Sequence, residues 1–172
     1  MKSTPEPDSN PVSDLDFREA MASLPAGVAV VTTWAEPDDP RGATVSAVCS
    51  LSAEPPLLLA CLGEGSDTGR AIVLGSPFMV NILSEGQEEV AKRFAVKDPT
   101  KFEAVPWEQG LLGLPQIAGV HAAVACEAVE CLPGGDHTIV VGQIQSTTIS
   151  SNGGPLLHWR RQFGSFGPPA VA

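Results

Sequence analysis

The pattern of apolar and polar positions along the chain predicts a series of short strands. Residues 27–34 (GVAVVTTW) and 57–62 (LLLACL) are mostly apolar or β-branched over the length of one strand, which is typical of strands buried in a sheet. The run at 57–62 has no polar side, so we expect it to lie centrally. Residues 43–52 (ATVSAVCSLS) alternate small hydroxyl side chains with apolar ones, which predicts one strand with a hydroxyl-rich face.

The strand pattern continues in the second half of the chain. Residues 77–83 (PFMVNIL) predict another strand. Residues 121–131 and 136–149 predict two strands that pair as a hairpin around the turn LPGG, and residues 155–163 predict a final short strand. The stretch that ends near Gly119 is rich in proline, tryptophan and glycine, and it predicts a loop.

Two or three short helices are expected between these strands. The first can be capped by Asp14 or Asp16 and runs through Ser23. A second follows the turn GEGSDTG and reaches about Leu74, and a third, amphipathic helix covers residues 86–94. Six or seven strands without regular alternation with helices predict a mainly β fold, as a closed or nearly closed antiparallel barrel.

The length of 172 residues fits one domain, which we expect to span residues 14–166 with loose tails at 1–13 and 167–172. Glycine (17) and proline (16) supply too many turn formers for a helix bundle. Aromatic residues make up only 5%, so the core must consist mainly of Val, Leu, Ile and Ala. Such small side chains allow thin layers and close approach of the backbone.

Charge and apolar length exclude two classes of partner. Ten basic residues against twenty acidic ones give a net charge of −10, which repels a phosphate backbone, so nucleic acid is not an expected partner. The opening MKSTPEPDSN lacks the apolar core of a signal peptide, and no apolar run approaches the length that spans a bilayer. We therefore expect no membrane association and a cytoplasmic location.

The cysteines show no pairing pattern. None of the four forms a CxxC pair, and they lie in apolar contexts, so buried reduced thiols are expected rather than a disulfide. They are Cys49, Cys61, Cys126 and Cys131. No His, Cys, Asp and Glu side chains stand at ligand spacing, so no metal site is predicted.

A glycine-rich turn follows the run at 57–62. The spacing of Gly63, Gly65 and Gly69 is GxGxxxG, one residue longer than a dinucleotide-binding fingerprint, and the candidate helix is too short for a doubly wound sheet. Two interpretations of this turn remain open. Ser66, Thr68 and free backbone amides could cradle a phosphate, or the segment is an ordinary turn in which Ser66 or Asp67 caps a helix.

Basic residues are concentrated in one short segment. Four of the ten fall within ten positions, at Lys92, Arg93, Lys97 and Lys101, and none occurs between residues 102 and 159. This segment could offset the repulsion between an acidic chain and an anionic cofactor. Alternatively, it is a solvated helix face that pairs with Glu88 and Glu89.

Among the three histidines, His137 is the best candidate for chemistry. It follows a glycine turn at the start of a strand, beside Asp136, where a side chain can face a pocket. His121 begins a strand and His158 lies beside Trp159, positions that are more typical of packing or rim residues.

Six blocks in this order resemble one known family: FREAMASLPAGVAVVTT, GATVSAVCSLSAEPPLLLACL, SPFMVNIL, the 87–94 helix with Lys101 and Phe102, GLPQIAGVHAAVACE and GDHTIVVGQI. From about Asp16 to Phe166 the chain resembles the short-chain flavin reductases of two-component flavin monooxygenase systems. The resemblance implies an FMN-binding split β-barrel of antiparallel, Greek-key type that forms a homodimer. It also implies reduction of FMN or FAD by NADH or NADPH, with reduced flavin passing to a separate oxygenase or halogenase.

The resemblance also implies which residues bind the cofactors. The flavin ring and ribityl chain would lie against Thr44, Val45, Ser46, Ala47, Val48 and Ser50. The phosphate-proximal turn would be Gly65, Ser66, Asp67 and Thr68, and later contacts would come from Arg93, Phe94, Lys101 and Phe102. The histidine of the GDH signature, His137, would approach the nicotinamide.

Two departures from the family pattern affect the expected site. Many relatives have Ser-Phe where this chain has Ala47-Val48, which makes the flavin pocket roomier and less polar. Relatives often carry tyrosine near the C-terminus, where this chain has His158, Trp159 and Phe163. The choices between FMN and FAD and between NADH and NADPH therefore stay open.

Two other functions fit the same pocket. One is a flavin-binding carrier or sensor without turnover, and the other is a flavin enzyme that acts directly on an organic substrate. The homodimer is expected from the family and from the Leu- and Gly-rich stretch at residues 106–119, which has too little regular structure to stand alone.

Overall fold

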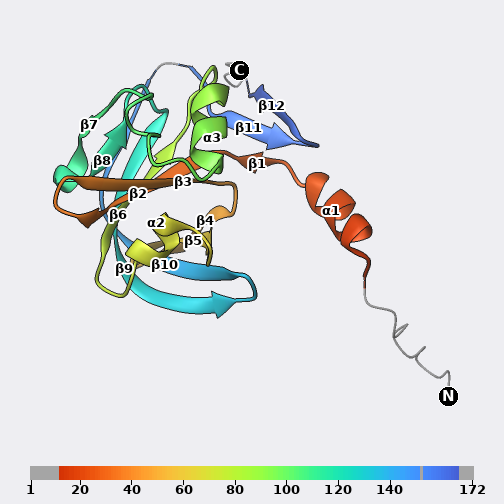
Figure 1. Ribbon diagram of the computed structural model, residues 1–172, viewed down its shortest axis with the longest axis horizontal. Helices are drawn as coiled ribbons and strands as arrows, with labels where there is room; N and C mark the ends of the chain where they lie inside the picture. Colours follow the sequence, from red (N-terminus) through yellow and green to blue (C-terminus); the bar gives the residue numbers. More distant parts are fainter. Residues whose placement is uncertain (1–11, 152, 167–172) are drawn as a thin grey trace.

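The computed structural model describes residues 12–151 and 153–166 as a mainly antiparallel β structure with few helices (Figure 1). Its strands are β1 (Ala26–Gly27), β2 (Ala29–Glu36), β3 (Asp39–Val45), β4 (Val48–Ala53), β5 (Pro56–Gly63), β6 (Pro77–Ile82), β7 (Trp107–Gln109), β8 (Pro115–Ile117), β9 (Ala122–Gly134), β10 (His137–Ile149), β11 (Leu156–Trp159) and β12 (Gln162–Ser165). Its helices are α1 (Asp14–Ala22), α2 (Asp67–Ala71), α3 (Glu88–Ala95) and a 3-10 turn (Leu111–Gly113).

Seven strands form the main sheet, in the order β3-β2-β6-β9-β10-β5-β4. Its two edge strands, β3 and β4, are separated in the chain only by Ser46 and Ala47, so the sheet must curl until its edges meet. The backbone N–H of Cys61 donates to the carbonyl of Ala47 at 2.9 Å, which closes this corner. The mainly β, antiparallel barrel is confirmed, but the single strand expected at 43–52 is wrong, because barrel closure breaks it between β3 and β4.

Strand β5 has neighbours on both sides, as its apolar sequence predicts. Leu58, Ala60 and Leu62 point into the barrel core, where they pack with Val140 of β10. The alternate residues face outward and, in register across β5 and β10, form what we call the outer apolar face. It consists of Leu57, Leu59, Cys61, Ile139 and Val141, all but the last only half-buried.

Strands β9 and β10 form the expected hairpin, but the last segment differs from expectation. The strand expected at 155–163 is two strands, β11 and β12, which pair with β1 in a small three-stranded sheet. Arg160 and Arg161 make the turn between them with φ of 48° and 64°. Left-handed backbone at both central positions matches the twist of a tight hairpin, and arginine gives no sequence signal for it.

The expected loop that ends near Gly119 contains regular structure. Strands β7 and β8 pair there, and the 3-10 turn lies between them. Ile117 is fully buried, and the edge of Trp107 meets the ring of Phe102 at 5.4 Å. The segment therefore packs inside this chain, and the long loop was a wrong prediction because those contacts are non-local.

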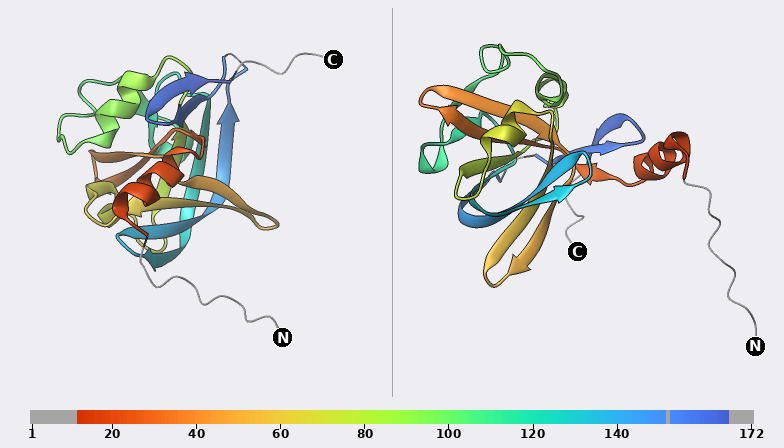
Figure 2. Two further views of the ribbon diagram at one scale, coloured as in Figure 1. Left: turned by 90° about the vertical axis from the view of Figure 1, so that its right-hand side faces the viewer. Right: turned by 60° about the horizontal axis from the view of Figure 1, so that its bottom comes forward.

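Helix α1 is capped by Ser13, whose side chain accepts from the N–H of Asp16 at 3.1 Å, rather than by either expected aspartate. No residue of α1 is buried, and the helix projects from the barrel (Figures 1 and 2). Helix α2 ends at Ala71, earlier than expected, and α3 forms as expected with Ala91 and Phe94 buried. Most of both expected tails falls outside the described residues.

The four cysteines are free thiols, but only Cys126 is buried. Cys49 is exposed because it lies on β4, an edge strand, so the expected burial is wrong there. Within residues 12–151 and 153–166, no helix is long and apolar enough to cross a membrane.

Candidate functional site

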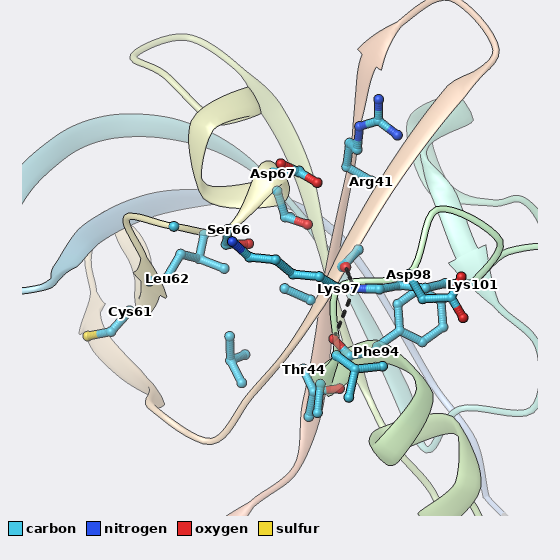
Figure 3. Close-up of a pocket in the computed structure, with 18 of the residues that line it drawn as sticks. Arg41, Thr44, Cys61, Leu62, Ser66, Asp67, Phe94, Lys97, Asp98 and Lys101 are labelled. Carbon is cyan, nitrogen blue, oxygen red and sulfur yellow. Dashed lines mark hydrogen bonds between the residues drawn. The ribbon is translucent and has the colours of Figure 1, made fainter.

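A cavity of about 630 Å³ opens where the two edges of the main sheet meet (Figure 3). Four segments build its wall: residues 40–47 of β3 and the break after it, residues 61–68 at the end of β5 and the start of α2, residues 94–102 after α3, and His137 at the start of β10. Barrel closure thus brings together segments that lie far apart in the sequence.

Most of the residues expected to bind the cofactors line this cavity. They are Thr44, Val45, Ser46, Ala47, Gly65, Ser66, Asp67, Thr68, Phe94, Lys101, Phe102 and His137. Three others lie outside it. Val48 packs against the barrel core, Ser50 is exposed on the edge strand β4, and Arg93 pairs with Asp98 at 2.8 Å. The break at Ser46–Ala47 explains the first two, because it carries Val48 and Ser50 to the opposite edge of the sheet.

Several lining residues were missed by the sequence analysis. They include Arg41, Gly42, Cys61 and Asp98. Lys97, which belongs to the cation-rich segment expected to offset an anionic cofactor, also lines the cavity. No local pattern pointed to the first four, because only the folding of the barrel brings their segments to one cavity.

Two aromatic rings and a glycine form one wall of the cavity. Phe94 and Phe102 meet edge-to-face with ring centroids 5.0 Å apart. A Cβ on Gly42 would lie 2.5 Å from Cε1 of Phe94, so the close approach of β3 to this ring requires glycine. The small residues that follow, such as Ala43 and Ala47, leave the backbone accessible to a flat ligand.

Lys101 is held within this wall. Its ammonium donates to the carbonyls of Gly42 at 3.2 Å and Phe94 at 3.3 Å. Burial lowers the pKa of Lys101, while the charges of Asp67 and Asp98 partly oppose that shift. The lysine thus links β3 to the end of α3 and presents a cation inside the cavity.

The glycine-rich turn on the opposite wall is capped. The side chain of Ser66 accepts from the N–H of Gly69 at 3.3 Å, which confirms the helix-capping interpretation for Ser66. Asp67 pairs with Arg70. The ammonium of Lys97 reaches this turn, 3.8 Å from where a Cβ on Gly65 would lie.

The cavity combines the features that a flavin phosphate needs. Arg41, Lys97 and Lys101 line it together with two carboxylates, an excess of positive charge in a chain of net charge −10. Arg41 is paired with Asp39 at 2.6 Å, whereas neither lysine has an ion-pair partner within the part of the chain that the structure describes. Ammonium groups without a carboxylate partner among the described residues, hydroxyls and a wall of small residues fit a flat ring that carries a phosphate.

His137 is oriented by its neighbour. Its Nδ1 lies 2.7 Å from a carboxylate oxygen of Asp136, and its Nε2 faces Gly63, 3.9 Å from where a Cβ on that glycine would lie. The interaction with His137 lowers the pKa of Asp136. In a neutral imidazole, an Nδ1–H that donates to Asp136 would leave Nε2 as an acceptor at the cavity.

The other two histidines lie outside the cavity. The ring of His158 packs on Phe163 with centroids 5.3 Å apart, and Nδ1 of His121 is buried without a hydrogen-bond partner among the described residues. Within the described ranges, no group of three His, Cys, Asp or Glu side chains could hold a metal ion.

Comparison with known proteins identifies the family. The flavin reductase like domain matches residues 21–167. The chain belongs to this family. The NADH flavin reductase of Kitasatospora aureofaciens is 39% identical over 153 residues, which cover 86% of this chain and 78% of the relative. The reductase component of the FADH2-dependent resorcinol hydroxylase of Rhizobium sp. MTP-10005 is 33% identical and covers 91% and 89% of the two chains.

Solved flavin reductases share the fold. The NADH:FAD oxidoreductase of Streptomyces globisporus C-1027, solved in complex with NAD and FAD fragments, superposes with a TM-score of 0.84 at 33% identity. The match covers 91% of this chain and 94% of that one. The split-barrel architecture inferred from the sequence therefore agrees with structures of this family.

Proposed function

We propose that this protein is an NADH-dependent flavin reductase that transfers hydride to FMN or FAD and supplies reduced flavin to a separate monooxygenase or halogenase. The observation that carries the proposal is one cavity in which two lysines, hydroxyls and small residues meet beside His137. Relatives that are named as flavin reductases or reductase components, matched over 78–94% of their own length, support it. When bound, the flavin supplies the ring that accepts the hydride and carries two electrons away.

The protein's own residues bind and orient the reactants. The backbone of Thr44, Ser46 and Ala47 provides the seat for a flat ring, and Lys97 and Lys101 offset the charge of its phosphate. His137, fixed by Asp136, accepts a hydrogen bond at Nε2 and so orients the nicotinamide carboxamide. No protein nucleophile takes part in this scheme.

The homodimer is part of the proposal. Leu59 and Ile139 belong to the outer apolar face, whereas a solvated sheet face normally carries polar residues. Helix α1 adds exposed apolar side chains at Leu15 and Phe17. A second copy covers these surfaces. Residues 106–119 no longer support the dimer, because that segment packs within its own chain.

Sedimentation equilibrium tests the dimer. The wild-type protein should have the mass of two chains, and Leu59→Asp should shift it to one chain because a carboxylate on the outer apolar face cannot be buried unpaired. Leu112→Asp is the matched control, because Leu112 is exposed on the 3-10 turn and does not belong to this face. A wild-type mass of one chain would contradict the dimer.

The reductase itself is tested by NADH consumption in air. The protein should oxidise NADH steadily when FMN or FAD is added and should need no organic substrate. Tight flavin binding without NADH consumption would indicate a carrier or sensor. Consumption only in the presence of an organic compound would indicate an enzyme that acts directly on it.

A cytoplasmic location accompanies this proposal, because free thiols persist in a reducing compartment.

A further inference from the structure

The side chain of Lys97 spans the mouth of the cavity. It starts from the segment after α3 and extends toward the turn at Gly65 and Ser66 on the opposite wall (Figure 3). Its ammonium lies 3.8 Å from the position that a Cβ on Gly65 would take, so it is within van der Waals reach of this turn. Lys97 is exposed and has no carboxylate partner within the described residues.

Asp98, the next residue, is held by three contacts. One carboxylate oxygen accepts from the guanidinium of Arg93 at 2.8 Å. The other accepts from the backbone N–H of Thr100 at 2.8 Å and from its hydroxyl at 2.7 Å. These contacts, with the Thr100 backbone first, lower the pKa of Asp98. The carboxylate thus fixes the segment between Lys97 and Lys101 and ties it to α3.

We propose that Lys97 makes this site select flavins that carry a phosphate, and that the Arg93–Asp98 pair positions Lys97 for that contact. The inference rests on the proposed function and deepens it. It also gives Arg93 a role different from the expected direct contact, because Arg93 does not line the cavity and its guanidinium is paired with Asp98, which does.

The other cations of the cavity are less able to distinguish a flavin that carries a phosphate from one that does not. Lys101 already donates to two carbonyls and sits in the wall, so its ammonium has less freedom than Lys97 to move toward a phosphate at the Gly65 turn. Arg41 is paired with Asp39. On the facing wall Asp67 is paired with Arg70, so its charge is partly offset. Lys97 is therefore the cation that remains available to a phosphate at the Gly65 turn.

Dissociation constants for oxidised FMN and riboflavin, measured by quenching of flavin fluorescence, test the inference. The two ligands share the ring and differ in the phosphate. Wild-type protein should prefer FMN, and Lys97→Met should reduce that preference about tenfold, the lower end for a hydrogen bond to a charged group, with riboflavin unchanged. Added salt should weaken FMN binding less in Lys97→Met than in wild type.

Lys92→Met is the matched control for this loss of charge. Lys92 is an exposed lysine of α3 that pairs with Glu89 at 2.6 Å and does not line the cavity. Its removal should leave the ratio of the FMN and riboflavin constants unchanged. An equal fall of the preference for FMN over riboflavin in Lys97→Met and Lys92→Met would overturn the inference, because net charge alone would then explain the preference.

Asp98→Asn separates positioning from simple electrostatics. The substitution removes a negative charge from the cavity, so electrostatics alone predicts tighter FMN binding. Loss of the Arg93 pair predicts the opposite, a severalfold weaker FMN binding with riboflavin unaffected. Tighter FMN binding by Asp98→Asn would overturn the positioning role.

The remaining outcomes separate this inference from the proposed function. Equal wild-type affinity for FMN and riboflavin would overturn the selectivity of Lys97 while leaving a flavin site intact. Failure of the wild-type protein to bind either flavin would overturn the proposed function and the inference with it.

Discussion

The contact between Gly42 and Phe94 makes a sharp test of the cavity wall. In Gly42→Ala the new Cβ would lie 2.5 Å from Cε1 and 2.7 Å from Cδ1 of Phe94, and 3.2 Å from Cζ of Phe102. Carbon atoms pack best at about 3.5–4.0 Å, so Phe94 must move by about 1 Å. That ring is 1% exposed and packs against Phe102, so it can move only by displacing its neighbours or by entering the cavity that it lines.

The expected cost follows from overpacking. Inserting one carbon into a closely packed core costs about 1–3 kcal/mol. For a chain of this length each kcal/mol lowers the melting temperature by about 2–4 °C, so we expect a decrease of about 2–12 °C. The carbonyls of Gly42 and Phe94 both accept from Lys101, so FMN affinity should fall as well.

Thermal unfolding followed by tryptophan fluorescence measures the loss, with Gly27→Ala as the matched control. A Cβ on Gly27 would meet nothing within 4 Å, so this variant should unfold within about 0.5 kcal/mol of wild type. Adding Phe94→Leu removes the clashing ring atoms, so the penalty of Gly42→Ala should shrink in the double variant. A Gly42→Ala protein as stable as wild type would refute the placement of Phe94 against β3.

Three further predictions concern the cavity and the thiols. His137→Ala should raise the KM for NADH while the Kd for FMN stays unchanged, and His158→Ala should alter neither; an unchanged KM in the first variant counts against the nicotinamide role. Because burial lowers the pKa of Lys101, its positive charge is lost as pH rises through that lowered pKa. FMN affinity should therefore fall at a lower pH than for an ordinary lysine, and Lys101→Met should remove that step; parallel wild-type and variant profiles would contradict it. Cys49 should react quickly with a thiol reagent, whereas Cys126, whose pKa burial raises to about 12, should react only on unfolding; loss of the fast phase in Cys49→Ser checks the assignment.

Local patterns predicted the elements that depend on local interactions. The apolar run of β5, the β9–β10 hairpin and the amphipathic α3 each follow from periodicity within one segment. Most residues of the candidate site could also be predicted from the sequence, because they come from contiguous blocks that keep their order in the family.

The wrong predictions share a non-local cause. The alternation of hydroxyl and apolar residues pauses at Ala47, Val48 and Cys49 and resumes at Ser50, which is too weak a signal to end a strand, and the closing of the barrel breaks the strand after Val45. In the sequence, Arg93 and Lys97 are two positive charges of the same segment, and their charge alone does not distinguish their roles. Their roles separate only when Asp98 takes the guanidinium of Arg93 and leaves Lys97 free to reach the opposite wall. Side-chain pairing of this kind depends on three-dimensional proximity.

The central claim is that the protein reduces flavin and then releases it. The most direct measurement mixes a small amount of protein with excess FMN and excess NADH in the absence of oxygen and follows the visible flavin absorbance. The account predicts that all of the flavin is bleached, many equivalents per chain, with one NADH consumed per flavin. Bleaching that stops at one flavin per chain, or no bleaching at all, would contradict it.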